Sequence, residues 1–242
     1  MSNMGNMSIA ENYRRVLQQV EEAALRAGRD PKDVRLMAVT KTVDEALIQE
    51  AAAAGAVLLG ENRVQELERK RPQFSACEMH LIGHLQTNKA AKAAACADMI
   101  QSVDSVRLAA ELERVCAKTG KVLPVLLEVN IGRDEAKFGF LPEQLEAALG
   151  EISAFSHILV RGLMTVPPYS ENIHKTKNFF LQMQQLYIDI RGKKLDNISS
   201  GNAAAGMDVL SMGMSGDYEL AIAAGSTLVR VGSAIFGERN YR

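Results

Sequence analysis

The sequence of 242 residues contains no tryptophan, and aromatic residues make up only 5% of it. Its formal charge is −1, from 28 basic and 29 acidic side chains. Proteins that bind nucleic acid usually present a basic surface or aromatic side chains that stack on bases, so we expect no nucleic-acid partner. Apolar residues make up 47% of the chain, which is ordinary for a globular protein with a sizeable core.

Cysteine and long apolar runs are also scarce. Cys77, Cys96 and Cys116 are odd in number, widely spaced and free of any CxxC pattern, which argues against a disulfide framework or a zinc site. Such usage favours a reducing compartment. The longest apolar runs, such as Ala51–Leu59, are too short to cross a bilayer, and the N-terminus lacks the apolar core of a signal peptide. We therefore expect a cytoplasmic protein with no membrane partner and no metal.

Strand-like and helix-like runs alternate along the chain. A first helix precedes the strands, because Ser8 and Glu11 fit a capping box and Gly28 ends the amphipathic run. Eight strand candidates follow, at 36–40, 56–59, 79–82, 99–103, 122–130, 158–166, 208–212 and 227–231. The helix candidates between them lie at 45–54, 63–71, 88–97, 104–118, 143–155, 173–190 and 217–224. We expect Asp44 and Asp104 to cap two of them.

Apolar strands separated by helices predict a parallel sheet covered on both faces. Eight such units in 242 residues match the (β/α)8 barrel, whose usual length is about 250 residues. A doubly wound open sheet is the alternative, but no GxGxxG follows the first strand. No linker or low-complexity tract interrupts the chain, so we expect one domain over residues 1–242. The polar stretch Gly192–Gly206 is either a loop or contains an additional strand at Leu195–Ser200.

Lys41 stands at the end of the first strand candidate, in the segment RLMAVTKT. A lysine there lies half in apolar surroundings, which favours the neutral amine that Schiff-base chemistry with an aldehyde needs. The alternative is a side chain that simply reaches from the strand end to solvent. In a barrel, functional side chains gather where the strands end. The other strand ends bring further polar residues to the same face, among them Asn62 and Glu128.

The last two strand ends carry sequences typical of a phosphate site. In many barrels, the loops after strands seven and eight bind phosphate through backbone N–H groups. GMSGD places Ser215 and Gly216 before a helix, and VGSAIFG places Gly232 and Ser233 at the next loop. Each segment alone fits an ordinary glycine turn with a serine cap. Their occurrence at both expected positions indicates phosphate binding.

Arg230 lies within the last strand, on the face opposite Val229 and Val231. A guanidinium inside a barrel needs a partner, which is either a carboxylate such as Glu128 or an acceptor on a bound ligand. An amine that traps aldehydes, a phosphate site and an arginine facing a ring acceptor together describe pyridoxal 5′-phosphate (PLP). His84 has no metal-ligand spacing with the other histidines, so we expect it to have a polar or capping role.

Several segments resemble the pyridoxal phosphate homeostasis protein family, also called PLP-binding or proline synthetase co-transcribed homologues. They are LMAVTKT, LLGENRVQEL, HLIGHLQTNK, KFGF, VRGLMTV and the long block LSMGMSGDYELAIAAGSTLVRVGSAIFGERNY. The resemblance spans nearly the whole chain. It implies a (β/α)8 barrel with an extra N-terminal helix, similar to the N-terminal domain of alanine racemase.

The resemblance also implies a role for each candidate residue. Lys41 matches the lysine that holds PLP covalently as an aldimine, and Arg230 matches an arginine near the pyridine nitrogen. Ser215, Gly232 and Ser233 match the phosphate site, and Asn62 and Ser211 fall in motifs near the cofactor. The expected PLP site therefore consists of Lys41, Asn62, Ser211, Ser215, Arg230, Gly232 and Ser233.

The function implied is reversible PLP binding in vitamin B6 homeostasis, without turnover of its own. Alanine racemase uses a second domain and a tyrosine of the partner subunit as its opposing base, and the chain ends soon after its last strand. We therefore expect no catalytic residue and a monomer, with PLP-dependent apoenzymes as recipients of the cofactor. A single-domain amino-acid racemase is the alternative, and a Schiff-base aldolase is a third reading.

Overall fold

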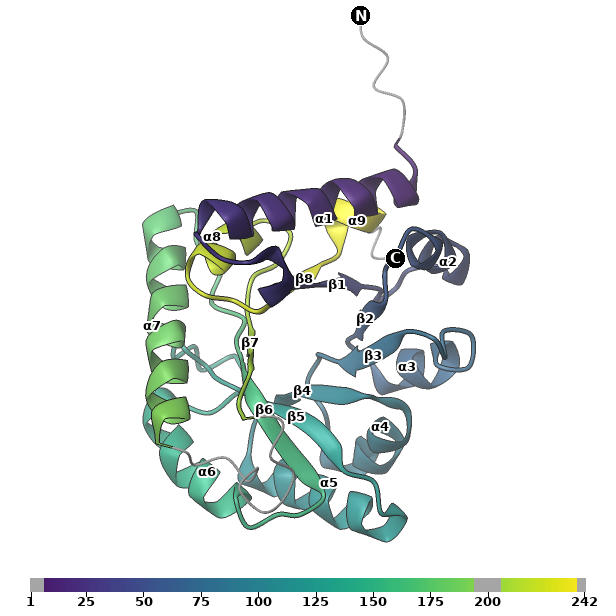
Figure 1. Ribbon diagram of the computed structural model, residues 1–242. Coiled ribbons are helices and arrows are strands. Elements are labelled where there is room, and N and C mark those ends of the chain that lie inside the picture. The colour runs from purple at the N-terminus through teal and green to yellow at the C-terminus, as the bar shows by residue number, and fades with distance from the viewer. Residues whose placement is uncertain (1–6, 194–205, 239–242) are drawn as a thin grey trace, which may run out of the picture.

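The computed structural model describes residues 7–193 and 206–238, and its strands form a closed parallel barrel (Figure 1). Each strand pairs with its neighbours in chain order, and β8 closes the barrel against β1. Within the described residues the strands are β1 (Arg35–Val39), β2 (Leu58–Glu61), β3 (Glu78–Leu81), β4 (Met99–Val103), β5 (Leu123–Glu128), β6 (Ile158–Met164), β7 (Val209–Ser211) and β8 (Leu228–Val231). The predicted (β/α)8 fold is confirmed, and the open sheet is excluded.

Helices surround the barrel on its outside (Figure 1). The α-helices of the described chain are α1 (Ile9–Arg26), α2 (Glu45–Ala53), α3 (Val64–Lys70), α4 (Ala90–Cys96), α5 (Val106–Thr119), α6 (Leu145–Ile152), α7 (Ile173–Gly192), α8 (Tyr218–Ala223) and α9 (Ser233–Phe236). Three short 3₁₀ turns are η1 (Pro31–Asp33), η2 (Thr87–Lys89) and η3 (Pro142–Gln144). The alternative strand at Leu195–Ser200 lies outside the described residues.

Two of the three helix caps predicted from the sequence are present. Ser8 and Glu11 form the predicted capping box at α1, and Asp44 caps α2 by accepting from the N–H of Ala46. The prediction that Asp104 caps α5 is wrong. Ser105 is the cap instead, because its hydroxyl accepts from the N–H of Leu108 and frees Asp104 for another partner.

Strand β2 begins two residues later than the sequence suggests. Ala56 and Val57 belong to the apolar run, but pairing with β1 starts only where Ala38 meets Leu59. The neighbouring strands therefore set the start of β2, and Gly60 and Glu61 become strand residues. Because Leu58 faces into the barrel, alternation along β2 turns the Glu61 side chain outward, toward the helices.

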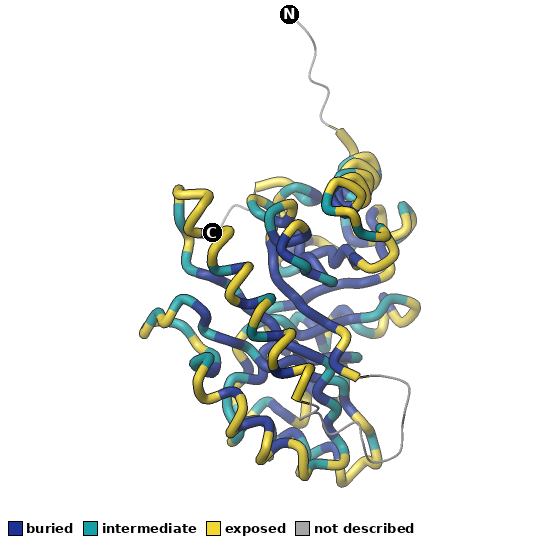
Figure 2. Tube along the Cα trace, turned by 60° about the vertical axis from the view of Figure 1, so that its left-hand side comes forward, coloured by how far each residue is buried: buried dark blue, intermediate teal, exposed yellow. Residues whose placement is uncertain are grey.

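Buried side chains form two groups that reflect the alternation of each strand. The larger cluster lies between the strands and the helices, and it includes Leu59, Leu127 and Val229. The smaller cluster fills the inside of the barrel: Met37, Val39, Leu58, Met99, Leu126, Met164, Val209 and Leu228. Figure 2 shows the result, with buried segments at the centre and exposed surface on the outer turns of the helices. Among the described helices, none is both long and apolar enough to span a membrane.

The extra N-terminal helix packs against the last helices of the chain. In Figure 1, α1 lies beside α8 and α9. The Asn12 amide donates to the backbone carbonyl of Ile235 at 3.2 Å, and the Tyr218 hydroxyl donates to Gln19 at 3.0 Å. The helix therefore joins the two ends of the described chain where the barrel closes.

Gly162, in β6, lies against the backbone of β7, and we predict that Gly162→Ala strongly destabilises the fold. Its φ is +153°, and a Cβ at this position would lie 1.7 Å from the backbone oxygen of Val209 on β7. The β6–β7 pairing would have to shift, at an expected cost of about 3 kcal/mol in unfolding free energy. Urea unfolding measures this cost.

Gly150→Ala in α6 is the matched control. A Cβ there would meet no heavy atom within 4 Å, and alanine is the better helix former. We expect Gly150→Ala to be neutral or to stabilise the protein by up to about 1 kcal/mol. Equal effects of the two substitutions would contradict the restricted β6–β7 contact.

Candidate functional site

A cavity of about 640 Å³ opens where the barrel strands end. Six of the seven residues predicted from the sequence line it: Lys41, Asn62, Ser215, Arg230, Gly232 and Ser233. They come from the ends of β1, β2 and β8 and from the loop between β7 and α8. The closed barrel thus brings together residues that are almost 200 positions apart in the sequence.

Lys41 and Asn62 reach the cavity from adjacent strands. Val39 points into the barrel, and Lys41, two residues later, keeps that direction and lines the cavity. Asn62 follows Glu61, the last residue of β2, and its backbone runs close to Gly83. A Cβ on Gly83 would lie 2.3 Å from the Asn62 carbonyl oxygen, so only glycine permits this approach.

The loops after β7 and β8 meet through Ser215. Its hydroxyl oxygen accepts from the backbone N–H of Gly232 at 3.2 Å and of Ala234 at 3.5 Å. Ser215, Gly216, Gly232 and Ser233 therefore form one polar wall of the cavity. Backbone N–H groups and hydroxyls in this arrangement suit an anion such as a phosphate group.

Arg230 carries its guanidinium into the barrel, and only 4% of the residue is exposed. Nη1 donates to the Ser211 hydroxyl oxygen at 2.6 Å, and Nη2 donates to the Thr165 carbonyl at 2.9 Å. Burial lowers the pKa of Arg230 to about 10, while Glu128 and Asp217 counteract this effect. The group is therefore a fixed positive charge at neutral pH beside the cavity.

Ser211 lies beneath Arg230 and does not line the cavity. It is the first member of a buried chain of hydrogen bonds through the barrel. The Ser211 hydroxyl donates to Gln101 at 2.7 Å, and the Gln101 amide donates to Nδ1 of His80 at 2.8 Å. Nε2 of His80 then carries the ring proton and donates to Glu78 at 2.6 Å. Ser211 thus contacts Arg230 and not the cavity.

Glu128 does not pair with Arg230, although it was one of the two partners expected. Within the described residues, this carboxylate forms no ion pair or hydrogen bond. Burial raises the pKa of Glu128 to about 7, and Asp104 adds to this effect, while Arg230 and Lys137 oppose it. Glu128 lines a hollow of about 250 Å³ that adjoins the main cavity at Ile82 and Val166.

His84 forms part of the wall of this smaller hollow. Its Nδ1 lies 2.9 Å from Oδ2 of Asp104, and its ring stacks on Phe138 with centroids 3.5 Å apart. The polar role expected for His84 is confirmed by these contacts. Among the described residues, no group of three or more His, Cys, Asp or Glu side chains is arranged to hold a metal ion.

The apolar part of the cavity wall was not predicted from the sequence. It consists of Val39, Ile82, Val166 and Met214, and the charged Glu238 is a further unpredicted lining residue. Alternation from the buried residues of each strand predicts that Val39 faces inward, so a signal for it existed. No comparable signal exists for Glu238, which lies beyond the last helix.

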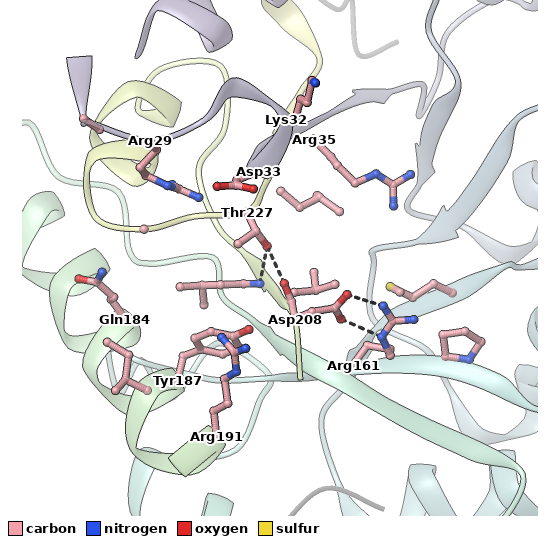
Figure 3. A pocket seen from close by; sticks show the side chains of 18 of the residues that line it. Arg29, Lys32, Asp33, Arg35, Arg161, Gln184, Tyr187, Arg191, Asp208 and Thr227 are labelled. Atoms are coloured by element: carbon pink, nitrogen blue, oxygen red, sulfur yellow. Dashed lines mark hydrogen bonds and ion pairs between the residues drawn. The ribbon is translucent and has the colours of Figure 1, made fainter. Parts of the chain in front are cut away.

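A larger cavity, of about 830 Å³, lies at the opposite end of the barrel (Figure 3). Four of its charged side chains form two ion pairs with each other. Arg161 donates to both carboxylate oxygens of Asp208, Arg35 pairs with Glu78, and Arg29 donates to two backbone carbonyls. Because this face of a barrel usually serves stability, these pairs are interpreted as structural.

The fold and the cavity define the class of this protein: a barrel of the alanine racemase N-terminal domain type. The family model described as alanine racemase, N-terminal domain, matches residues 8–240. Alanine racemase from Corynebacterium glutamicum has the same fold, with a TM-score of 0.72 and 20% identity over 96% of this chain and 61% of that chain.

The chain belongs to the pyridoxal phosphate homeostasis protein family. The family member of that name from Aquifex aeolicus is 37% identical over 97% of this chain and 100% of that protein. The Escherichia coli K12 member is 36% identical over 96% of this chain and 97% of that protein. PipY from Synechococcus elongatus, in a structure with PLP bound, has a TM-score of 0.79 and 35% identity over 95% of this chain and all of that chain.

We predict that Glu128→Gln changes how protein stability depends on pH. The pKa of Glu128 is about 7 in the folded protein and 4.5 for an ordinary glutamate, so the folded protein binds this proton more tightly than the unfolded chain does. Stability from Glu128 is therefore present below about pH 4.5 and is lost as the pH rises through about 7. Glutamine mimics the neutral acid and avoids this loss.

The measurement is the unfolding free energy of both proteins, determined with urea at several pH values. We expect similar stabilities near pH 4.5 and an advantage of about 2 kcal/mol for Glu128→Gln above pH 7. Glu135→Gln, which changes an exposed carboxylate on the neighbouring loop, is the control. If the difference in unfolding free energy between Glu128→Gln and wild type stays constant with pH, the pKa of Glu128 is not raised in the folded protein.

Proposed function

We propose that this chain, as one barrel domain over residues 1–242, binds PLP reversibly through Lys41 and serves PLP homeostasis. The observation that carries the proposal is the convergence of three chemistries on one cavity. A lysine amine, a polar wall of serine and glycine, and a buried guanidinium all line it. Its volume of about 640 Å³ lies in the range typical of small-molecule sites.

Each residue has a distinct role in this proposal. The Nζ of Lys41 attacks the aldehyde carbon of PLP, one water molecule leaves, and hydrolysis reverses the reaction. Ser215, Gly232 and Ser233 hold the phosphate through N–H and O–H donors. Arg230 donates toward the ring nitrogen. Asn62, which lines the same cavity, contacts the ligand in this proposal, whereas Ser211 acts only through Arg230.

The proposal assigns PLP as cargo, with no turnover by the chain itself. Racemisation needs two bases on opposite faces of the substrate. Among the described residues that line the cavity, Lys41 is the only lysine, none is a tyrosine, and the one carboxylate is Glu238, beyond α9. An arginine at the ring nitrogen also leaves that nitrogen unprotonated, which weakens the ring as an electron sink. The names of the curated relatives support the same role.

The proposal also covers location and partners. Cys77, Cys96 and Cys116 are free thiols, and burial raises the pKa of each, so they are poorly reactive. This supports a reducing, cytoplasmic setting. We further propose a monomer that passes PLP to PLP-dependent apoenzymes. The exposed side chains of Met214 and Tyr169 near the cavity support contact with such recipients.

Lys41→Ala is expected to abolish covalent PLP binding. Wild-type protein mixed with PLP should gain the visible absorbance of a Schiff base, and borohydride should fix a pyridoxyl group on Lys41. Lys92→Ala, which removes an exposed lysine on α4, should behave like wild type. A wild-type protein that takes up no PLP, or a pyridoxyl group found on another lysine, would refute the assignment.

Two further measurements address the competing enzyme functions. A racemase would introduce solvent deuterium at the α-carbon of an added amino acid, and we expect no exchange across a broad panel. An aldolase for phosphorylated sugars would leave substrate carbons on Lys41 after borohydride treatment, and we expect none.

Ser215→Ala is expected to weaken binding of PLP more than binding of pyridoxal, which lacks the phosphate. The variant removes one hydroxyl from the polar wall and the acceptor that joins the two loops. We expect the preference for PLP over pyridoxal to fall roughly tenfold, as for loss of a hydrogen bond to a charged group. Ser170→Ala on the loop after β6 is the control. Equal losses for both ligands would place the phosphate elsewhere.

A further inference from the structure

Behind Lys41, on the outer side of the strands, lies a lysine with no exposed side-chain surface. It is Lys70, the last residue of α3. Its Nζ donates to the backbone carbonyl of Thr40 at 2.8 Å, to Oε1 of Glu61 at 2.8 Å and to Oε2 of Glu66 at 3.2 Å. All three N–H donors of the ammonium group are therefore used inside the protein.

Two of these contacts fix the backbone on either side of Lys41. Thr40 precedes Lys41, and its carbonyl is held by Lys70. Thr42 follows Lys41, and its N–H donates to Oε2 of Glu66 at 2.8 Å. Thr42 has a φ of +58°, which a β-branched residue rarely adopts. Glu66 in turn accepts from Lys70, so one buried ammonium group supports both flanks of the turn.

We propose that Lys70 is a positioning residue for Lys41. It does not line the cavity, and it acts by holding the Thr40–Thr42 turn so that the Lys41 amine points into the cavity. The proposal rests on the proposed function, because PLP is the aldehyde that Lys41 captures. The role proposed for Lys70 affects how fast and how tightly Lys41 binds PLP.

Stability alone is a poor explanation for the buried pair of Lys70 and Glu61. Replacing a buried ion pair by apolar side chains of similar size is often neutral or stabilising. The pair here is also incompletely satisfied, because Oε2 of Glu61 is buried and has no hydrogen-bond partner. The contacts of Lys70 account for this arrangement. Lys70 holds the carbonyl of Thr40, and it holds the Glu66 carboxylate that accepts from the Thr42 N–H.

The consequence for chemistry follows from the geometry of attack. An amine reacts with an aldehyde only from a narrow range of distances and angles, and displacement by about 1 Å costs up to about 100-fold in rate. Without Lys70, the Thr40 carbonyl loses a hydrogen-bond donor, and the Glu66 carboxylate loses the ammonium group that holds it in place. The strained Thr42 can then relax, and Lys41 moves with it.

The first test compares Lys70→Met with wild type in two measurements. One is the rate at which added PLP is captured, followed by visible absorbance. The other is hydrogen exchange of the Thr42 amide in the protein without PLP, followed by NMR. We expect capture to slow at least about tenfold and Thr42 to exchange faster. Lys92→Met, which changes an exposed lysine on α4, should alter neither.

Lys70→Met leaves Glu61 buried without its cation, so this variant can fail to fold. The double variant Glu61→Leu/Lys70→Met removes both charges and should fold like wild type. Glu66→Ala is a third variant, which leaves the buried pair intact and removes the acceptor for the Thr42 N–H. We expect slow capture and fast Thr42 exchange in both.

The proposal would be overturned if any of these variants folds, captures PLP at the wild-type rate and shows unchanged hydrogen exchange of the Thr42 amide. The two measurements also separate the proposals from each other. If wild type captures no PLP, the proposed function fails, while Thr42 exchange still reports whether Lys70 holds the turn. If wild type captures PLP and the folded variants do so equally well, only the role of Lys70 fails.

Discussion

A guanidinium inside the barrel is the constraint on which the organisation of the interior depends. Arg230 is 4% exposed, and a buried charge without partners would be very costly. Two of its N–H donors are met by the Ser211 hydroxyl and the Thr165 carbonyl. Ser211 then needs an acceptor of its own, which Gln101 supplies. One charge therefore makes inward positions on several strands polar, where a barrel interior is usually apolar.

This chain of hydrogen bonds has a single direction. Each member donates toward the next, from Arg230 through Ser211, Gln101 and His80 to Glu78. Burial lowers the pKa of His80, which keeps its ring neutral and lets Nδ1 accept. The hydrogen bond from His80 lowers the pKa of Glu78 to about 2, so the chain ends on a carboxylate. The positive end therefore faces the cavity, and the negative end lies at the opposite face of the barrel.

The sequence was sufficient to predict the fold and most of the cavity, because both depend on periodicity. Eight alternations of strand and helix fix the barrel, and the barrel then brings all strand ends together. That is why Lys41, Ser215 and Gly232, which are distant in sequence, were correctly predicted to meet. Strand boundaries were less predictable, since pairing with β1 and β3 delays the start of β2.

Interactions between individual side chains were not predictable in this way. Nothing in the run VQELERK distinguishes Lys70 from an exposed helix lysine, because its burial depends on Glu61 being a strand residue. The same limit applies to Asp104, which fits an N-cap by sequence but contacts His84. Ser211 belongs to a site motif, yet the direction of its hydroxyl toward Gln101 and Arg230 appears only in three dimensions.

The charged side chains at the two ends of the barrel have different partners. At the N-terminal end, Arg35 pairs with Glu78, and Arg161 pairs with Asp208, as Figure 3 shows for the second pair. At the C-terminal end, Lys41 lines the cavity, and Arg230 contacts only neutral groups. Lys41 and Arg230 therefore supply positive charge to the C-terminal cavity, and hydrogen bonds to Ser211 and Thr165 fix the position of the guanidinium.

Reversible binding of such a ligand places a different demand on the protein than catalysis does. An enzyme needs a second acid or base that acts on the bound ligand, whereas a carrier needs only a well-placed amine and a weakly reactive surrounding. The wall near Lys41 includes the apolar side chains of Val39, Ile82 and Val166, which transfer no protons. Precise placement of the amine is then the property that the fold must secure, and it does so from outside the cavity. Contacts that hold Thr40 and Thr42 fix the turn without adding a reactive group to the site.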